Sequence, residues 1–335
     1  MKISIAIPTR NRSRFLANLL RSILRQTRLP EEVIIVDDSD TDETVRLARD
    51  NHSIFLNKGI ALKYLHGNNE NMSTSAARNL GIDESSGEII FLIDDDVILH
   101  NNYISEILKI YREYPMAKGV QGYIMNGDFA FSNFKNFILN AIKKIFWLDH
   151  VEKNKCIYRM GLIYPYSPDG IIRCEWLHGT NMSFKKEVFA CFRFDENLRR
   201  RSIGEDVDLT SRIHRHYPDS LFMNPRAKLL HISTSRKINK YSMYSKFPYI
   251  IYLTAKNQEP TLRKTIHLFW YFLGLFIVNG GLPLLVLKDA EPFFCLTKSF
   301  FSAFSHLGDV KKGDFRFIDS MLQANRESGV VYCKR

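Results

Sequence analysis

The first hundred residues alternate short apolar runs with segments whose apolar side chains recur at helical spacing. Apolar runs of about four to eight residues, rich in β-branched side chains, are typical of strands buried on both faces. Between the first two runs, Phe15, Leu19 and Ile23 fall on one stripe, which predicts a helix. This alternation predicts an α/β fold with a mostly parallel sheet and helices on both faces. The strands are expected at Ile3–Ile7, Val33–Val36, Ala61–Leu65 and Glu88–Ile93.

Polar side chains follow three of these strands, at the point where each strand ends. In an open α/β sheet, ligands bind outside the carboxyl ends of the strands. The three segments are therefore expected to form one ligand-binding edge, although each alone would also fit a turn or a helix cap. They are Thr9-Arg10-Asn11, Asp37-Asp38-Ser39 and Asp94-Asp95-Asp96.

The triplet Asp94-Asp95-Asp96 places three carboxylates side by side. Their mutual repulsion has to be neutralised, and hard divalent cations prefer carboxylate oxygens. Mg²⁺ is usually held by one or two carboxylates together with substrate phosphates. The triplet therefore indicates a metal–phosphate site, with a solvated turn as the alternative.

The net charge of +11 and the pI of about 9.3 call for an anionic partner. Basic and aromatic residues are interleaved between Arg226 and Lys264, but no recognised nucleic-acid motif accompanies them, so no nucleic-acid partner is predicted. The five cysteines lack any C-x-x-C pair, which argues against a disulfide framework and a cysteine-ligated zinc site. A strand pattern from Lys2 leaves no room for a secretory signal and predicts a cytoplasmic protein.

A late stretch, 266–287, contains no Asp, Glu, Lys or Arg. Its length is near the ~20 residues that span a bilayer, but Asn279-Gly280-Gly281-Leu282-Pro283 interrupts it. The interruption favours a re-entrant or in-plane hairpin, peripheral or monotopic on the inner face of the cell membrane. Flanking basic residues suit that anionic surface, and a buried core helix is the alternative.

The second half carries three further polar motifs. Gly179-Thr180-Asn181 is expected in a turn, Glu205-Asp206 stands before a helix, and His231 ends a strand. Acids in the first turn favour a helix dipole, and the functional alternative is a general base. The remaining expected elements are a strand at 120–124, helices at 129–148 and 185–191, and a loop with one or two short strands at 149–175.

Taken in order, these motifs resemble the family 2 nucleotide-diphospho-sugar glycosyltransferases, inverting enzymes of the GT-A fold, particularly bacterial members that build surface polysaccharides. The resemblance covers roughly residues 1–235. It rests on Ile7-Pro8-Thr9-Arg10-Asn11-Arg12, Val36-Asp37-Asp38-Ser39, Ala76-Ala77-Arg78-Asn79, Asp94-Asp95-Asp96, Gly179-Thr180-Asn181-Met182-Ser183-Phe184, Gly204-Glu205-Asp206-Val207-Asp208-Leu209 and His231.

The resemblance implies a role for each matching position. Asp206 would be the catalytic base, with Glu205 beside it. Asp96 would ligate Mn²⁺ or Mg²⁺ directly, Asp94 would act through the ribose or a water, and His231 would complete the metal–diphosphate cluster. The expected nucleotide-sugar contacts are Pro8, Thr9, Arg10, Asn11, Asp37, Asp38, Arg78, Asp94 and Asp95. The expected acceptor side is Trp176, Gly179, Thr180 and Asn181.

Two domains are expected on this basis. Residues 1–235 would form the GT-A domain, with a nucleotide-binding half at 1–110 and an acceptor and catalytic half at 111–235. Residues 236–335 would form a basic, aromatic and apolar helical extension that associates with the membrane. The predicted reaction moves a sugar from a nucleotide-diphosphate donor to a saccharide or lipid-linked saccharide acceptor, in cell-surface polysaccharide synthesis.

Two alternatives remain. A sugar-nucleotide pyrophosphorylase would need a glycine-rich phosphate loop after the first strand, where this chain has Pro8 to Arg12 without glycine. A non-catalytic, basic membrane-binding protein would not need acids at successive strand ends.

Overall fold

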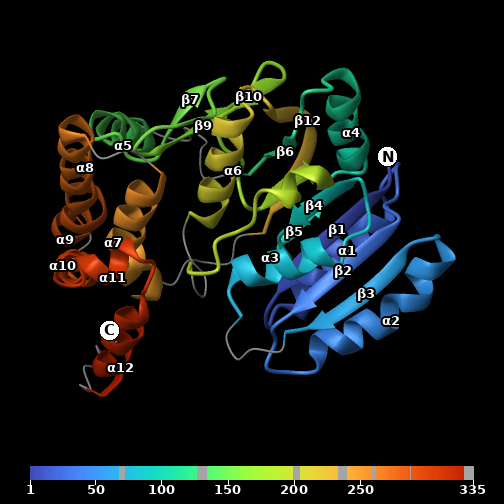
Figure 1. Ribbon diagram of the computed structural model, residues 1–335, viewed down its shortest axis with the longest axis horizontal. Helices are drawn as coiled ribbons and strands as arrows, with labels where there is room; N and C mark the ends of the chain where they lie inside the picture. Colours follow the sequence, from blue (N-terminus) through green and yellow to red (C-terminus); the bar gives the residue numbers. More distant parts are fainter. Residues whose placement is uncertain are drawn as a thin grey trace.

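A computed structural model shows a central sheet with helices on both faces and a group of C-terminal helices beside it (Figure 1). The helices from α7 onward lie together on one side of the sheet, and α6 stands between them and the first strands. The structure describes residues 1–67, 72–126, 134–198, 204–232, 240–257, 261–286 and 288–327.

The four predicted strands of the first half are present and parallel. β1 pairs with β2 and β4, and β2 pairs with β3. Ile3, Ile5 and Ile7 of β1 pack on the side of α1, α2 and α4, whereas Ala6 belongs to the core on the opposite face. The elements are β1 (Ile3–Thr9), α1 (Ser13–Leu24), β2 (Glu32–Asp37), α2 (Glu43–Asn57), β3 (Ala61–His66), α3 (Thr74–Asp83) and β4 (Ile89–Ile93).

The second half extends the same sheet in the order β10-β12-β6-β11-β4-β1-β2-β3, with β5 paired to β12. Within this order β11 and β10 run against the other strands, so the predicted mostly parallel sheet is confirmed. The added elements are β5 (Val97–Leu99), α4 (Tyr103–Glu113), β6 (Gly119–Ile124), β10 (Ile172–Cys174), β11 (Asn181–Lys185), α6 (Glu205–His216) and β12 (Leu221–His231).

Two local predictions were wrong. The helix expected at 185–191 is the end of β11 followed by a 3₁₀ helix, η1 (Lys186–Ala190). The segment 149–175 forms four short strands instead of one or two, because they pair with one another and with β12, which local periodicity does not reveal. Besides β10 they are β7 (His150–Lys153), β8 (Ile157–Tyr158) and β9 (Leu162–Tyr166).

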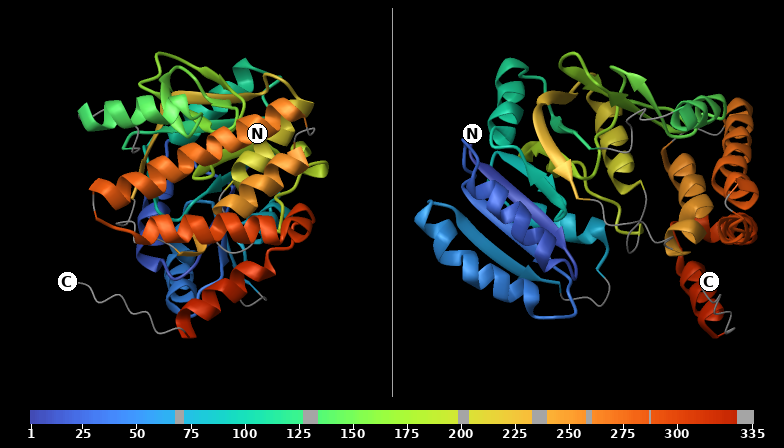
Figure 2. Two further views of the ribbon diagram at one scale, coloured as in Figure 1. Left: turned by 90° about the vertical axis from the view of Figure 1, so that its left-hand side faces the viewer. Right: turned by 180° about the vertical axis from the view of Figure 1, so that it is seen from behind.

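The C-terminal helices lie together beside the rest of the chain (Figure 2). They have their own aromatic core. Tyr244, Phe247, Tyr249 and Tyr252 are buried in it, so these interleaved aromatics pack inward. Helix α5 (Phe134–Ile145) packs against the same core and lies within the predicted helix at 129–148, whose residues 129–133 are outside the described residues. The helices are α7 (Lys240–Asn257), α8 (Leu262–Leu275), α9 (Leu282–Val286), α10 (Glu291–Ser305), α11 (Leu307–Lys311) and α12 (Arg316–Glu327).

The expected break in the apolar stretch is not a hairpin. Helix α8 continues through a π-helix, η2 (Phe276–Gly281), into α9, because the N–H of Leu282 bonds the carbonyl of Ile277 five residues earlier. This wider turn accommodates Pro283, which has no N–H to donate. Leu262–Leu285 is therefore one helix long and apolar enough to cross a membrane, a test that a core helix of a soluble protein also passes. Leu287, the end of the predicted stretch, and the predicted domain boundary at 235 and 236 lie outside the described residues.

Candidate active site

The carboxyl ends of β1, β2 and β4 bring the three predicted polar segments together. The Thr9 hydroxyl donates a hydrogen bond of 2.7 Å to the Asp95 carboxylate. The Arg10 guanidinium forms an ion pair of 3.0 Å with the carboxylate of Asp38. Segments that follow three different strands thus meet at one edge of the sheet, which confirms the convergence expected from the strand-end pattern.

Asp37 and Asp38 have different surroundings. Asp37 is buried, and its carboxylate accepts hydrogen bonds from the Ser39 N–H at 3.0 Å and the Tyr64 hydroxyl at 2.9 Å. The side chain of Asp38 is 13% exposed, and burial raises its pKa even though Arg10 acts to lower it. Of the two predicted nucleotide contacts, Asp38 is the more accessible and Asp37 holds the turn after β2.

The loop after β1 is held by its own polar groups. Pro8 is part of β1 itself, and Asn11 has a φ of 55°, in the left-handed region. The Asn11 side chain donates to the Asp40 carboxylate at 2.7 Å and accepts from the Asp40 N–H at 3.0 Å. Asn11 therefore ties the loops after β1 and β2 together.

Arg12, which is absent from the predicted site residues, pairs with the aspartate triplet. Its Nη1 lies 3.0 Å from Asp95 Oδ1 and 2.7 Å from Asp96 Oδ2. Burial raises the pKa of Asp95 to about 6. Burial acts in the same direction on Asp96, but His231 and Arg12 hold the pKa of that carboxyl below its usual value. The sequence showed Arg12 only as a cation three residues after the first strand and did not connect it to the acids after the fourth strand.

His231, at the end of β12, pairs with Asp96. His231 Nε2 lies 3.2 Å from Asp96 Oδ1, and hydrogen bonding to this carboxylate raises the pKa of His231. Asp96 Oδ1 is buried, and it is the oxygen that faces the His231 ring. An imidazole nitrogen and a carboxylate oxygen that face each other fit a divalent ion held together with phosphate oxygens and water.

The predicted metal ligands Asp94, Asp96 and His231 remain a prediction. Within the described residues, no three or more His, Cys, Asp or Glu side chains are grouped to hold a metal ion. The Asp94 carboxylate instead accepts a hydrogen bond of 2.9 Å from Arg78. Asp94 is therefore neutralised by a buried cation of the protein, and Asp96 and His231 are left as the candidate ligands.

Arg78 links four segments of the chain. Its side chain is 2% exposed and comes from α3. Nη1 donates to Glu205 at 3.0 Å, and Nη2 donates to both Asp94 and the carbonyl oxygen of Gly179, each at 2.9 Å. The guanidinium thus joins the end of β4, the segment before β11 and the start of α6. The predicted contact of Arg78 with the nucleotide remains a prediction.

Glu205 and Asp206 open α6, directly after Gly204, whose φ is 97°. Glu205 is buried, and burial together with the neighbouring Asp206 carboxylate raises its pKa. Asp206 is only partly buried, and its carboxylate accepts hydrogen bonds from the N–H groups of Gly179 at 2.7 Å and Val207 at 2.8 Å. Asp206 is therefore the more accessible carboxylate and is held in one orientation.

The predicted acceptor-side residues are placed unequally. Trp176, Thr180 and Asn181 are buried, and the Asn181 side-chain oxygen accepts from the Gly122 N–H at 2.7 Å. Trp176 and Asn181 line a cavity of about 20 Å³ together with His178, enough for one water. These three side chains lie in the protein interior behind the site, whereas the Gly179 backbone contacts Asp206 directly. His178, whose pKa is lowered by burial, was missed by the sequence analysis although it directly precedes the Gly179-Thr180-Asn181 motif.

The chain is similar in sequence to known proteins. The model of the family described as Glycosyl transferase family 2 matches residues 4–168. A protein of Rickettsia bellii described as an uncharacterized glycosyltransferase is 34% identical over 112 residues, which cover 33% of this chain and 15% of that protein. Glycosyltransferase GlyG of Streptococcus pneumoniae is 29% identical over 215 residues, 64% of each protein. The O-antigen chain rhamnosyltransferase RfbN of Salmonella typhimurium is 31% identical over 122 residues, 36% of this chain and 37% of RfbN. The chain thus spans only about a sixth of the first of these relatives.

Solved structures share the fold. TarS 1–349 of S. aureus in complex with UDP-GlcNAc has a TM-score of 0.57 at 17% identity, covering 96% of this chain and 83% of that one. The mannosyltransferase PcManGT of Pyrobaculum calidifontis, in complex with GDP-Man and Mn²⁺, has a TM-score of 0.55 at 14% identity, covering 99% and 81%. The chain therefore has the GT-A fold and carries a glycosyl transferase family 2 domain.

Proposed function

We propose that this protein is a metal-dependent inverting glycosyltransferase. It moves a sugar from a nucleoside-diphosphate donor to a hydroxyl of a saccharide or lipid-linked saccharide acceptor, in the synthesis of a cell-surface polysaccharide. The observation that carries the proposal is the meeting of two carboxylate groups at one sheet edge. One belongs to the Asp96–His231 pair, and the other is Asp206, oriented beside the Arg78 cluster. The family match favours glycosyl transfer over pyrophosphorylase chemistry.

Asp206 is the general base of this proposal. An acceptor hydroxyl is a weak nucleophile until a positioned carboxylate removes its proton during attack, a contribution of about 10²–10⁴-fold. Asp206 is accessible and its orientation is set by two N–H groups, whereas Glu205 is buried against Arg78. Glu205 therefore positions Arg78, and Arg78 in turn holds the Gly179 carbonyl beside the base.

The donor side is the edge formed by the first two strands and the triplet. Asp38, partly exposed after β2, suits a ribose hydroxyl, and Thr9 holds Asp95 in place. Asp96 and His231 would hold the Mn²⁺ or Mg²⁺ ion, which supplies positive charge to the leaving diphosphate when bound. A neighbour of this fold described in complex with GDP-Man and Mn²⁺ supports a nucleotide sugar and a divalent ion as partners.

The proposed division of labour follows three parts of the chain. Residues 1–110 bind the nucleotide, 111–235 carry the base and the acceptor side, and 236–335 attach the enzyme to the cytoplasmic face of the membrane. The long apolar helix supports this attachment, since Leu262, Ile266 and Phe269 expose 77%, 58% and 54% of their surface. The cell-surface role is supported by the likeness to a protein described as an O-antigen chain rhamnosyltransferase.

The test combines donor binding with transfer. Thermal unfolding of the full chain is followed with UDP-, GDP- and dTDP-sugars, with and without Mn²⁺, and transfer is measured with the donor that stabilises. Asp206→Asn is expected to lower transfer at least 10²-fold while keeping Mn²⁺-dependent donor binding. Asp219→Asn, which changes an exposed acid paired with Arg173, is the matched control and should leave transfer unchanged.

Two results would count against the proposal. Near wild-type turnover by Asp206→Asn would show that another group is the base. Absence of any Mn²⁺-dependent stabilisation of the wild-type protein by nucleotide sugars would refute the donor site itself.

A further inference from the structure

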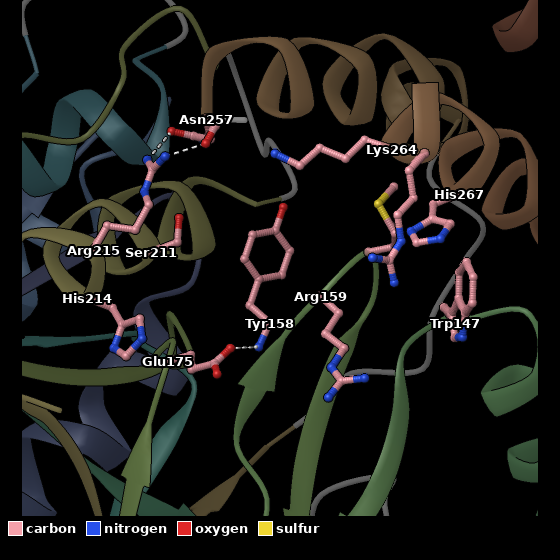
Figure 3. Close-up of a pocket in the computed structure, with 12 residues that line it drawn as sticks. Trp147, Tyr158, Arg159, Glu175, Ser211, His214, Arg215, Asn257, Lys264 and His267 are labelled. Atoms are coloured by element: carbon pink, nitrogen blue, oxygen red, sulfur yellow. Dashed lines mark hydrogen bonds between the residues drawn. The ribbon is translucent and has the colours of Figure 1, made fainter. Parts of the chain in front are cut away.

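A second cavity, of about 580 Å³, lies away from the sheet edge, between α6, the β8–β9 hairpin and the start of α8 (Figure 3). Cavities of several hundred Å³ are the usual size of small-molecule sites. Its wall contains Ser211, His214 and Arg215 of α6, Tyr158 and Arg159 of the hairpin, and the first residues of α8. None of these residues takes part in the proposed transfer chemistry.

The cavity is strongly basic. Arg159, Arg215, Arg263 and Lys264 line it, and Glu175 is the one acid among its lining residues. Glu175 accepts a hydrogen bond of 3.0 Å from the Tyr158 N–H. In Figure 3 the side chains of Arg159 and Lys264 extend into the open space on either side of Tyr158. Positive groups gathered in a concave site attract an anion with several acceptor oxygens.

Three of these cations have no acidic partner among the residues that the structure describes. Arg159, Arg263 and Lys264 form no ion pair with any acid in the described ranges of the chain. Arg215 differs, because its guanidinium is hydrogen-bonded to the carbonyl and, at 2.9 Å, to the side-chain oxygen of Asn257. One side of the cavity is therefore preorganised and the other presents free charge, which suits a phosphate or diphosphate.

An exposed apolar surface adjoins the cavity. Leu262, Ile266, Phe269 and Leu273 recur at helical spacing on α8 and are 77%, 58%, 54% and 48% exposed. Arg263, Lys264 and His267, on the same helix turns, line the cavity instead. Helix α8 thus presents cations to the cavity and hydrocarbon to its outside.

Trp147 connects the two surfaces. It lines the cavity, is 37% exposed, and packs edge-on against His267 with ring centroids 4.4 Å apart. Nearby, the Trp270 indole N–H donates at 2.8 Å to the carbonyl of Ile145, which is itself 61% exposed on α5. Amphipathic rings of this kind are enriched where a protein meets the interfacial region of a membrane.

We propose that this cavity binds the phosphate group of a lipid, whose hydrocarbon part lies on the exposed apolar surface of α8 and α5. The ligand chemistry is an anionic phosphate or diphosphate joined to an apolar chain. The cations of the cavity, which pair with no acid within the described residues, match the anionic end of such a molecule. The aromatic side chains at the rim and the adjoining exposed hydrocarbon match its apolar end.

The proposal deepens the function proposed above and rests on it in one respect, the use of the lipid as acceptor. Helix α6 runs from Asp206 at its start to Arg215 in the cavity wall. At about 1.5 Å per residue, these positions are roughly 13 Å apart along the helix axis. A lipid-linked saccharide with its diphosphate in the cavity would therefore direct its sugar along α6 toward the base.

The test measures binding of the full chain to vesicles by co-sedimentation. The vesicles contain neutral phosphatidylcholine alone, phosphatidylcholine with phosphatidylglycerol, or phosphatidylcholine with a polyprenyl diphosphate at equal surface charge. The double variant Arg159→Gln/Lys264→Gln is compared with Arg25→Gln/Lys58→Gln, which removes the same charge from exposed positions of the first half. Each basic group at an anionic surface raises the binding constant roughly fivefold. Loss of two such groups should therefore weaken vesicle binding about thirtyfold, for the cavity variant only.

The two anionic lipids separate the two sources of phosphate. Stronger binding to polyprenyl diphosphate than to phosphatidylglycerol identifies a lipid carrier, and equal binding identifies bulk anionic lipid; both support the site. Equal binding by the cavity variant and its control would overturn it. Binding of free inorganic pyrophosphate with the same affinity as the diphosphate lipid would also overturn the proposal. The apolar surface would then contribute nothing to lipid binding.

Donor binding is measured on the same samples. Stabilisation by nucleotide sugar that is retained in the cavity variant shows an intact fold and donor site. If the variant does not fold, the charge-conserving Arg159→Lys/Lys264→Arg takes its place and should bind anionic vesicles within about fivefold of wild type. Weaker binding than that would refute a site built on charge. Vesicle binding without any transfer activity would refute the proposed function but not the lipid site.

Discussion

Replacing Arg78 with methionine removes the buried cation that joins the acidic groups of the site while keeping most of the side-chain volume. The wild-type guanidinium is 2% exposed and pairs with Asp94 at 2.9 Å and Glu205 at 3.0 Å. Removing one partner of a buried ion pair costs about 3–5 kcal/mol, because the remaining charge stays desolvated. We expect Arg78→Met to lower the free energy of unfolding by this amount at pH 8.

The loss should depend on pH in a defined direction. The pKa of Glu205 is already raised by burial and by Asp206, and loss of Arg78 raises it further. An acid whose folded pKa lies above its unfolded pKa adds stability below the unfolded pKa, and that stability disappears as pH rises through the folded value. The variant is therefore expected to be less destabilised at pH 6 than at pH 8. Adding Glu205→Gln should recover part of the loss at pH 8.

Urea unfolding at pH 6 and pH 8 measures these differences. The matched control is Arg193→Met, which removes an exposed pair with Asp83, 44% and 54% exposed, and should cost at most about 1 kcal/mol. A loss in Arg78→Met below about 1 kcal/mol at pH 8, or an equal loss at both pH values, would refute the account of Arg78 as a buried charge link.

Three further predictions concern single residues of the site. Burial raises the pKa of Asp95 from 3.8 to about 6, so ionisation of this carboxyl costs stability as pH rises through that range. In thermal melts, Asp95→Asn should therefore be about 3 kcal/mol more stable than wild type at pH 8 and gain less at pH 5. A larger gain at pH 5 than at pH 8 would contradict this prediction. A Cβ on Gly179 would lie 3.0 Å from Asp206 Oδ2 and 3.1 Å from Arg78 Nη2, so Gly179→Ala should lower kcat about tenfold, and an unchanged kcat would argue against Asp206 as base. His231→Ala should raise at least about tenfold the Mn²⁺ concentration at which a nucleotide sugar stabilises the protein. An unchanged Mn²⁺ midpoint would exclude His231 as a metal ligand.

Much of the donor edge was predictable because it depends on local pattern and on a general property of parallel sheets. The strands that precede Thr9, Asp38 and Asp94 were readable as apolar runs, and strand ends of one direction meet at one edge. Arg12 was missed, since its partners Asp95 and Asp96 are 83 and 84 residues away and no local pattern connects them.

The structure of the second half was harder to predict from the sequence. The short strands between 149 and 175 depend on pairing with one another and with β12 more than on their own periodicity. The glycines and Pro283 of the apolar stretch indicated a break by propensity, but packing of α10 and α7 around η2 leaves a continuous helix with one wide turn. Tertiary packing overrode local propensity in both places.

The sequence by itself determined the α/β class, the order of the first strands and helices, and the edge at which the polar segments meet, because periodicity and strand direction are local properties. Only the tertiary structure decided that Arg78 binds Glu205, 127 residues away, and Gly179, 101 residues away, and that Asp94 serves this link. The basic cavity between α6, the β8–β9 hairpin and α8 likewise exists only in the tertiary structure. Contacts between such distant segments form only when burial of the apolar faces brings their elements together.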